Sequence, residues 1–355
     1  MHRRDFLRIA AAGWVGTLDA RAVVARSPFA EGRVMTVLGP ISPGELGSTL
    51  PHEHVLVDFI GADTVSRDRY DANEAYAVAL PFLRTARSLG CRALAECTPA
   101  YLGRDPQLLS RLAKATGLHI LTNTGYYGAA KDRYVPRHAY QESADQLAGR
   151  WVKEWTDGIE GTGIRPGFIK TGADAGPLSA MDRKLVQAAA RTHARTGLTI
   201  ASHTGDTRAA LDQMEVLAEE RVRPDAFIWV HAQNDWEVES RVEAARTGAW
   251  IEIDNIDDKT VPVCVERVTA MKQRGCLSRL LVSHDAGWFR PGEPGGGAFR
   301  GFETVYTAFV PSLRKAGWTQ SEVRQLLAAN PAAAFTVRGQ TPIRPPIPAA
   351  PATSV

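Results

Sequence analysis

Short apolar segments, each followed by a helix-like stretch, are the feature that most constrains the fold of this chain. The segments are four to six residues long, and most are almost continuously apolar. Such runs are typical of parallel strands that are buried on both faces. The eight segments are Thr49–His52, Arg92–Cys97, His119–Thr124, Phe168–Thr171, Thr199–His203, Phe227–His231, Trp250–Ile253 and Leu280–His284.

Strands that alternate with helices in this way predict an α/β protein with a (β/α)8 TIM barrel fold. A doubly wound open sheet is the alternative, because periodicity alone does not separate the two folds. Glycines support the helix ends, since Gly197 follows the predicted helix Leu178–Thr196 and Gly248 follows Asp235–Thr247. Residues 33–47 precede the first strand, and we expect them to form a small hairpin that closes the bottom of the barrel.

The two ends of the chain differ from this pattern. Arg3 and Arg4, followed by a short and weakly apolar stretch, resemble a twin-arginine export signal, with Ala20-Arg21-Ala22 as a candidate cleavage site. We therefore expect a signal peptide in residues 1–30, a single barrel domain in 31–338 and a Pro/Ala-rich tail in 339–355. The protein would be periplasmic or secreted. The alternative is a cytoplasmic protein with a basic N-terminal helix.

Charge and hydropathy exclude some partners. The chain has 42 Lys and Arg against 39 Asp and Glu, and a net charge of +3 gives no reason to expect nucleic-acid binding. No segment approaches the ~20 apolar residues that cross a bilayer, so we expect no stable membrane insertion. The sequence leaves open whether the protein forms a homodimer.

Metal-competent side chains fall where these strands end. His52 and His54 flank a single residue and point to the same side of a strand, although this H-x-H pattern alone is weak evidence. His203 and His231 end two other strands, and Asp285 directly follows the last. In a β/α barrel these ends converge on one mouth, so together the five predict a metal site.

Lys170 ends the fourth strand segment and would point at the same mouth. A cationic lysine beside metal ions would be repelled and costly to bury. It either turns away into an ion pair or is carboxylated by CO2, which would convert it into an anion with two oxygen ligands.

A family resemblance emerges from these residues together with their neighbours. The chain resembles the phosphotriesterase family of the amidohydrolase superfamily over about residues 36–334, with the motifs in the family's order. The motifs are Leu50-Pro51-His52-Glu53-His54, Phe168-Ile169-Lys170, Ser202-His203-Thr204, Val230-His231 and Val282-Ser283-His284-Asp285, with Gly103-Arg104-Asp105 and Asn330-Pro331 in addition.

The resemblance implies a centre of two divalent metal ions, with zinc as the default for imidazole and carboxylate ligands. Lys170, as N6-carboxylysine, and a hydroxide would bridge the two metals. The other implied ligands are His52, His54 and Asp285 for the buried metal, and His203 and His231 for the exposed one.

The resemblance also implies a hydrolase of small-molecule esters, in which the bridging hydroxide attacks a carboxyl ester, a lactone or a phosphoester. Asp285 would take up the proton in addition to binding metal. The alternative is a non-catalytic periplasmic zinc-binding protein on the same scaffold.

The residues that contact the substrate are less well defined by the sequence. The candidates in the loops after the strands are Tyr126, Tyr127, Asn255, Trp288 and Arg290. Tyr127 is similar to a tyrosine that lactonase-type relatives keep near the metals, but Asn255 stands where those relatives have an arginine. Glu96 ends the second strand and is either a partner of the ligands, a substrate contact or part of an ordinary salt bridge.

Overall fold

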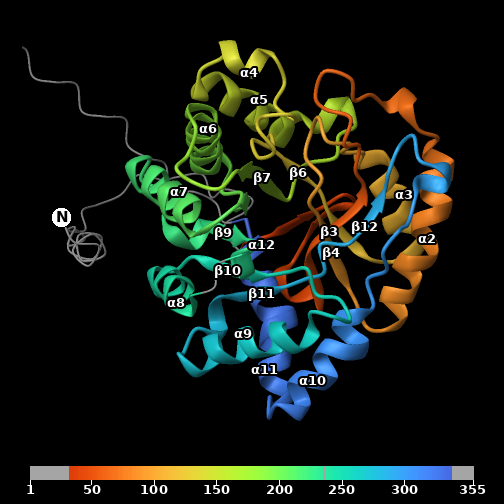
Figure 1. The fold of residues 1–355 in the computed structure, drawn as a ribbon. Helices are drawn as coiled ribbons and strands as arrows, with labels where there is room; N and C mark the ends of the chain where they lie inside the picture. The colour runs from red at the N-terminus through yellow and green to blue at the C-terminus, as the bar shows by residue number, and fades with distance from the viewer. Residues whose placement is uncertain (1–31, 235–236, 338–355) are drawn as a thin grey trace, which may run out of the picture.

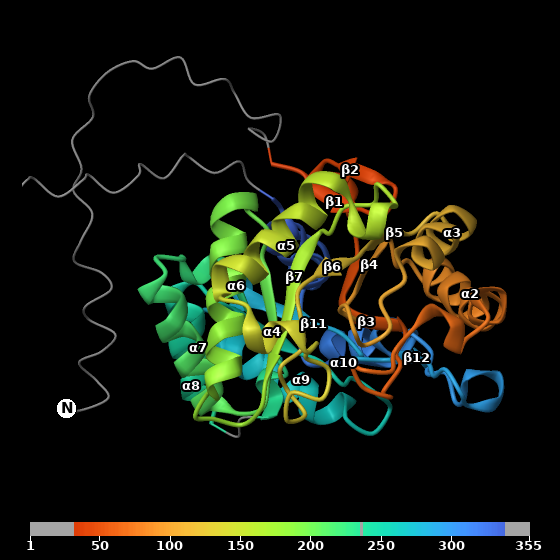
Figure 2. The same ribbon diagram turned by 90° about the horizontal axis from the view of Figure 1, so that it is seen from above.

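Strands surrounded by helices form the part of the chain that the structure, a computed structural model, describes: residues 32–234 and 237–337. Figures 1 and 2 show the strands in the middle of the molecule and the helices on its outside. The arrangement is the predicted (β/α)8 barrel of the α/β class. The predicted signal peptide and the predicted tail both lie outside the described residues. Within them, no helix combines the length and apolarity needed to span a bilayer.

Parallel pairing runs around the barrel from β3 to β5 and from β6 to β11. β5 and β6 occupy one barrel position, interrupted at Thr122, and the barrel closes where the Asp285 amide donates to the His52 carbonyl at 3.1 Å. The strands are β1 Val34–Thr36, β2 Gly39–Ile41, β3 Thr49–Leu56, β4 Ala93–Glu96, β5 His119–Leu121, β6 Asn123–Thr124, β7 Phe168–Ala173, β8 Ile200–Thr204, β9 Phe227–Val230, β10 Trp250–Ile253, β11 Leu280–Val282 and β12 Gly287–Phe289.

The helices pack their apolar sides against the strands. Gly197 and Gly248 take the left-handed conformation directly after α6 and α8, as the sequence predicts. The α-helices are α2 Ala72–Ser88, α3 Pro106–Thr116, α4 His138–Gln141, α5 Ala144–Asp157, α6 Ala180–Thr196, α7 Thr207–Glu219, α8 Val238–Thr247, α9 Val261–Gln273, α10 Val310–Lys315, α11 Gln320–Arg324 and α12 Asn330–Phe335.

Several predicted strand limits differ from those of the structure, and two of the differences affect candidate metal ligands. β3 does not end at His52 but continues to Leu56, because the extra strand β12 pairs with its second half. The H-x-H pair therefore lies inside a strand and not at its end. β11 ends at Val282 and not at His284, because the chain turns there toward β12.

The predicted hairpin is confirmed, since β1 and β2 pair antiparallel. Figure 2 shows it at one end of the barrel. Val34 from this hairpin and Phe335 from α12 join the apolar cluster that fills the barrel, and the Phe335 ring packs against Phe168 with centroids 5.4 Å apart. The lower barrel is therefore a closed core, and functional side chains are confined to the other end.

Strand alternation carries the inward-facing positions from this core up to the mouth. Phe168, Ala201 and Trp250 belong to the apolar cluster. Two residues further along the same strands lie Lys170, His203 and Glu252. Because side chains two apart share a face, the strands that build the core also aim polar groups into one upper layer.

We expect Asp182 to make stability fall with rising pH. It closes the capping box of α6 with Ser179, and its second carboxylate oxygen is buried without a hydrogen-bond partner. Burial raises the pKa of Asp182 to about 6, above the ~3.9 of an unfolded chain. The folded state therefore binds more protons between these values, so stability is lost as pH rises from about 4 to about 6. The free energy of unfolding should fall by on the order of 2 kcal/mol over this range.

Chemical denaturation of Asp182→Asn and the unmodified protein across this range checks the expectation. The stability difference should move in favour of the variant as pH rises. A constant difference from pH 4 to 7 would contradict it.

Candidate metal centre

A cavity of about 200 Å³ opens at the carboxyl ends of the barrel strands. Its walls bring together side chains from β3, β7, β8 and from the loops after β9 and β11. All six predicted metal ligands line it: His52, His54, Lys170, His203, His231 and Asp285.

One carboxylate orients two of the histidines. Asp254 Oδ1 lies 2.7 Å from His231 Nδ1, and Asp254 Oδ2 lies 3.1 Å from His52 Nδ1. Glu252 Oε1 is a second partner of His52 Nδ1 at 3.0 Å. With Nδ1 engaged in this way, Nε2 of each ring is the nitrogen left for a metal. Sequence reasoning missed Glu252 and Asp254 as partners, although strand alternation on β10 would have placed them on the inner face.

His54 is held from another direction. Its Nδ1 lies 2.8 Å from Thr98 Oγ1, and Glu96 accepts hydrogen bonds from the backbone amides of Thr98 and Val55. Burial raises the pKa of Glu96 to about 7. Of the roles considered for Glu96, the structure shows that of a support for the loop that orients His54, with no salt bridge among the described residues.

Asp285 sits in the turn between β11 and β12 with a φ of +51°, which is unusual for a residue other than glycine. Its Oδ1 lies 3.2 Å from His54 Nε2 and 3.7 Å from His52 Nε2. Burial alone would raise the pKa of Asp285, but the two imidazoles outweigh it and hold this pKa below its ordinary value. These three side chains offer ligand atoms close enough together to share one cation.

His203 and His231 face each other across the other half of the cavity, with ring centroids 4.4 Å apart. Burial lowers the pKa of His203 well below its ordinary value, with His231 and Lys170 adding to the effect. The ring is therefore held neutral, which is the form that binds metals. This pair adds two further imidazoles to the lining of the cavity.

Lys170 is buried to 1% exposure between the two histidine groups. Within the described part of the chain its amine makes no hydrogen bond or ion pair. The Tyr127 ring lies beside it, with its centroid 5.6 Å from Nζ. The ion pair considered from the sequence is thus not formed, and an uncompensated ammonium would be costly here.

The charge balance of the cavity also fits metal cations. Burial lowers the pKa of His52, yet Cys97, Asp285, Asp254 and Glu252 outweigh it and hold the pKa well above its ordinary value. The carboxylates around this ring thus favour positive charge at their centre. Imidazole nitrogens and carboxylate oxygens are the ligand types that zinc takes. The residues present therefore fit two divalent cations.

Only part of the predicted substrate contacts reach the cavity. Tyr127 and Trp288 line it. Tyr126 faces the other way, with its hydroxyl 3.1 Å from His138 Nε2. Asn255 is exposed, and Arg290 pairs with Glu293 at 2.8 Å. The sequence did not reveal which of two adjacent loop residues points inward, because loops lack strand alternation.

Apolar side chains that the sequence did not single out complete the walls. They come from the end of β3, from the loop after β4 and from the loop after β6. The residues are Val57, Phe59, Leu102, Ala130 and Tyr134.

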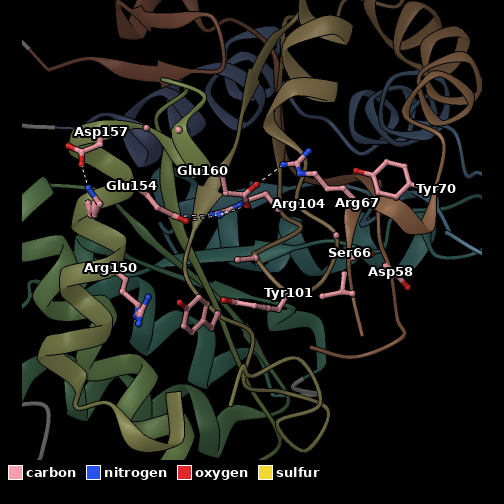
Figure 3. Close-up of a pocket in the computed structure, with 17 residues that line it drawn as sticks. Asp58, Ser66, Arg67, Tyr70, Tyr101, Arg104, Arg150, Glu154, Asp157 and Glu160 are labelled. Atoms are coloured by element: carbon pink, nitrogen blue, oxygen red, sulfur yellow. Dashed lines mark hydrogen bonds and ion pairs between the residues drawn. The ribbon is translucent and has the colours of Figure 1, made fainter. Parts of the chain in front are cut away.

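Figure 3 shows a second cavity, with a volume of about 590 Å³. Several of its charged groups pair with one another: Arg104 with Glu154 at 2.7 Å, and Arg67 with Glu160 at 2.8 Å. None of the groups of potential metal ligands found in residues 32–234 and 237–337 lies there. Although larger, this cavity therefore offers no comparable chemistry.

The two cavities share a wall. Val57 and Phe59 line the metal cavity while Asp58 lines the outer one. In the loop after β4, Leu102 lines the metal cavity while Tyr101 and Gly103 line the outer one, and the Asp58 amide donates to the Leu102 carbonyl at 2.8 Å. Tyr127 and Tyr126 divide in the same manner.

Comparison with known proteins agrees with this site. The model of the Phosphotriesterase family matches residues 32–335, and the chain belongs to this family. It is 29% identical to the phosphotriesterase homology protein of Escherichia coli, covering 81% of this chain and 98% of that protein. It is 27% identical to human N-acetyltaurine hydrolase, over 84% and 97% of the two chains. A mutant of the PTE-like lactonase from Deinococcus radiodurans has a similar structure, with a TM-score of 0.76, 29% identity and coverage of 85% and 99%.

Replacing Asp254 by Asn should weaken zinc binding by about 10- to 100-fold, as loss of a group that orients metal ligands commonly does. The amide would donate to one Nδ1 and so move that imidazole's proton to Nε2, which blocks the ligand atom. Asp257→Asn is the control, because Asp257 lies in the same loop but bonds only to local groups at residues 259 and 260. Competition with a chelating dye measures both, and zinc affinity unchanged in Asp254→Asn would refute this role.

Proposed function

We propose that this protein hydrolyses esters with the help of two divalent metal ions, zinc by default, bound in the cavity described above. The observation that carries the proposal is the convergence of five metal-competent side chains on a buried lysine that has no counter-ion. Membership of the phosphotriesterase family supports it. His52, His54 and Asp285 would hold one metal, and His203 and His231 the other.

We propose further that Lys170 is N6-carboxylysine. Its position between the two ligand groups suits a bridge, and carboxylation would replace a costly buried ammonium by an anion with two oxygen ligands. The modified side chain would then balance the charge of the metals.

The chemistry follows from these groups. When bound, paired metals make a water molecule acidic enough to act as a nucleophile and polarise the ester oxygen. Asp285 has a carboxylate in contact with two imidazoles and faces the cavity, so it is placed to accept the proton of the attacking water. Tyr127 and Trp288 limit the access of bulk water from the sides.

The walls favour an uncharged substrate. Among the described residues that line the cavity, Lys170 is the sole lysine or arginine, and it is committed to the metals. Apart from the proposed metal ligands and Cys97, the wall is aliphatic and aromatic, with the hydroxyls of Tyr127 and Tyr134. A carboxyl ester, a lactone or a phosphotriester fits this lining, whereas N-acetyltaurine, the substrate named for the human relative, carries a sulfonate.

The proposed location is the periplasm or the exterior, reached by twin-arginine export. Replacement of Arg3 and Arg4 by Lys would then leave the protein in the cytoplasm. Cell fractionation checks this, and normal export of the double variant would refute it.

With added zinc, the protein should hydrolyse members of a panel of aryl esters, lactones and phosphotriesters, and Asp285→Asn should lose about 10²- to 10⁴-fold in kcat/KM, the range typical of a general base. Lys131→Ala, in an exposed loop, serves as the control. Binding of two zinc ions without turnover on any panel member would favour the non-catalytic zinc-binding alternative.

Metal reconstitution should depend on bicarbonate. After chelation, zinc added with bicarbonate should restore more activity than zinc in CO2-free buffer, because Lys170 must be carboxylated again. Lys170→Met should show no such dependence and should bind less zinc. Equal recovery of the unmodified protein in both buffers would contradict the carboxylated lysine.

A further inference from the structure

Glu53 is a fully buried carboxylate that the proposed chemistry does not use. It lies on β3 between His52 and His54, and alternation turns it away from the cavity toward the turn after β11. Within the described residues it has no lysine or arginine partner. So complete a burial requires that its oxygens be satisfied by hydrogen bonds.

Every one of its side-chain partners belongs to the turn that carries Asp285. Glu53 Oε1 accepts from Ser283 Oγ at 2.7 Å, from the His284 amide at 3.0 Å and from His284 Nδ1 at 2.6 Å. Glu53 Oε2 accepts from the Ala286 amide at 2.9 Å. The backbone amides on both sides of Asp285 are thus bound to one side chain.

The direction of the histidine contact follows from the far side of the ring. His284 Nε2 accepts from the Val305 amide at 2.9 Å, and an amide can only donate. The ring therefore carries its proton on Nδ1 and donates it to Glu53. All four groups that contact Glu53 are donors, so its carboxylate accepts each of these hydrogen bonds.

The bonds hold a conformation that the chain would otherwise leave. Asp285 has a φ of +51°, a strained region for a side chain other than glycine, and such strain persists only where neighbours enforce it. The same turn directs the Asp285 carboxylate toward the Nε2 atoms of His52 and His54.

We infer that Glu53 is a positioning residue for Asp285, and that it maintains one of the two metal sites selectively. This inference rests on the proposed function. Among the described residues, the side-chain hydrogen bonds of Glu53 go to residues 283–286 and not to His203 or His231, so the second site should survive its replacement. Glu53 lies between the two histidines of the H-x-H pair. It would thus support, from outside the cavity, the metal site to which both histidines belong.

Glu53→Gln tests this with little change in shape. Its amide oxygen can still accept at the Oε1 position, but its NH2 group would face the Ala286 amide, donor against donor. Equilibrium dialysis with zinc alone should then show one tight site retained and the other weakened by about 10- to 100-fold. A cobalt-loaded sample should lose the part of its visible spectrum that comes from the weakened site.

Glu154→Gln is the matched control, because this carboxylate bonds to Arg104 and Thr124 far from the turn. It should lower the melting temperature without changing the zinc stoichiometry. If Glu53→Gln fails to fold, Ser283→Ala removes one of the donors to Glu53, together with the hydroxyl that accepts from the His52 amide, and should weaken the same site to a smaller degree.

The outcomes separate the inference from the proposed function. If the unmodified protein does not bind two zinc ions, the proposed function fails. If it binds two and hydrolyses esters, while Glu53→Gln keeps both affinities and the cobalt spectrum, the inference about Glu53 is refuted and the function stands. Equal weakening of both sites would also refute it, since Glu53 would then support the fold in general.

Discussion

Strand alternation inside a closed parallel barrel is the constraint on which the rest of the structure depends. Each strand passes from an apolar lower layer to a polar upper layer with its side chains on one face. Phe168 and Trp250 anchor the lower layer, and Lys170 and Glu252 occupy the upper one on the same strands. Because the strand ends meet at one mouth, residues more than 200 positions apart in the sequence become neighbours, although no sequence motif links them.

Buried charge is organised in two layers around this mouth. Inside the cavity, carboxylate and imidazole groups leave the amine of Lys170 unpaired. Outside it, Asp254 accepts hydrogen bonds from His52, His231 and Gln233, and Glu53 accepts from the turn that carries Asp285. The hydrogen bonds of these outer carboxylates fix the orientation of the ligand side chains. The ligand atoms that face the cavity stay free. An arrangement of this kind favours precision of the site over the stability that an apolar core would provide.

The fold and the ligand positions were predictable because both follow from periodicity. Runs such as Phe227–Val230 are strongly apolar, and His231 directly follows that strand. The strand limits at β3 and β11 were not predictable, because they depend on pairing with β12, a three-residue strand with no pattern of its own. The same holds for Tyr126, Asn255 and Arg290, whose directions are set by loop backbone. Glu53 was visible in the sequence only as the spacer of an H-x-H pair, since its partners lie about 230 residues away.

The wall between the two cavities has a consequence for how such a site can change. Each of its segments exposes one residue to the metal cavity and the next to the outer cavity, as with Leu102 and Tyr101. Inserting or deleting a single residue there would exchange the residues that face the two cavities, for example Tyr101 for Leu102. Point substitutions can adjust either cavity by itself, but changes in loop length remodel both at once. An insertion that changes the metal cavity would therefore also change the outer cavity.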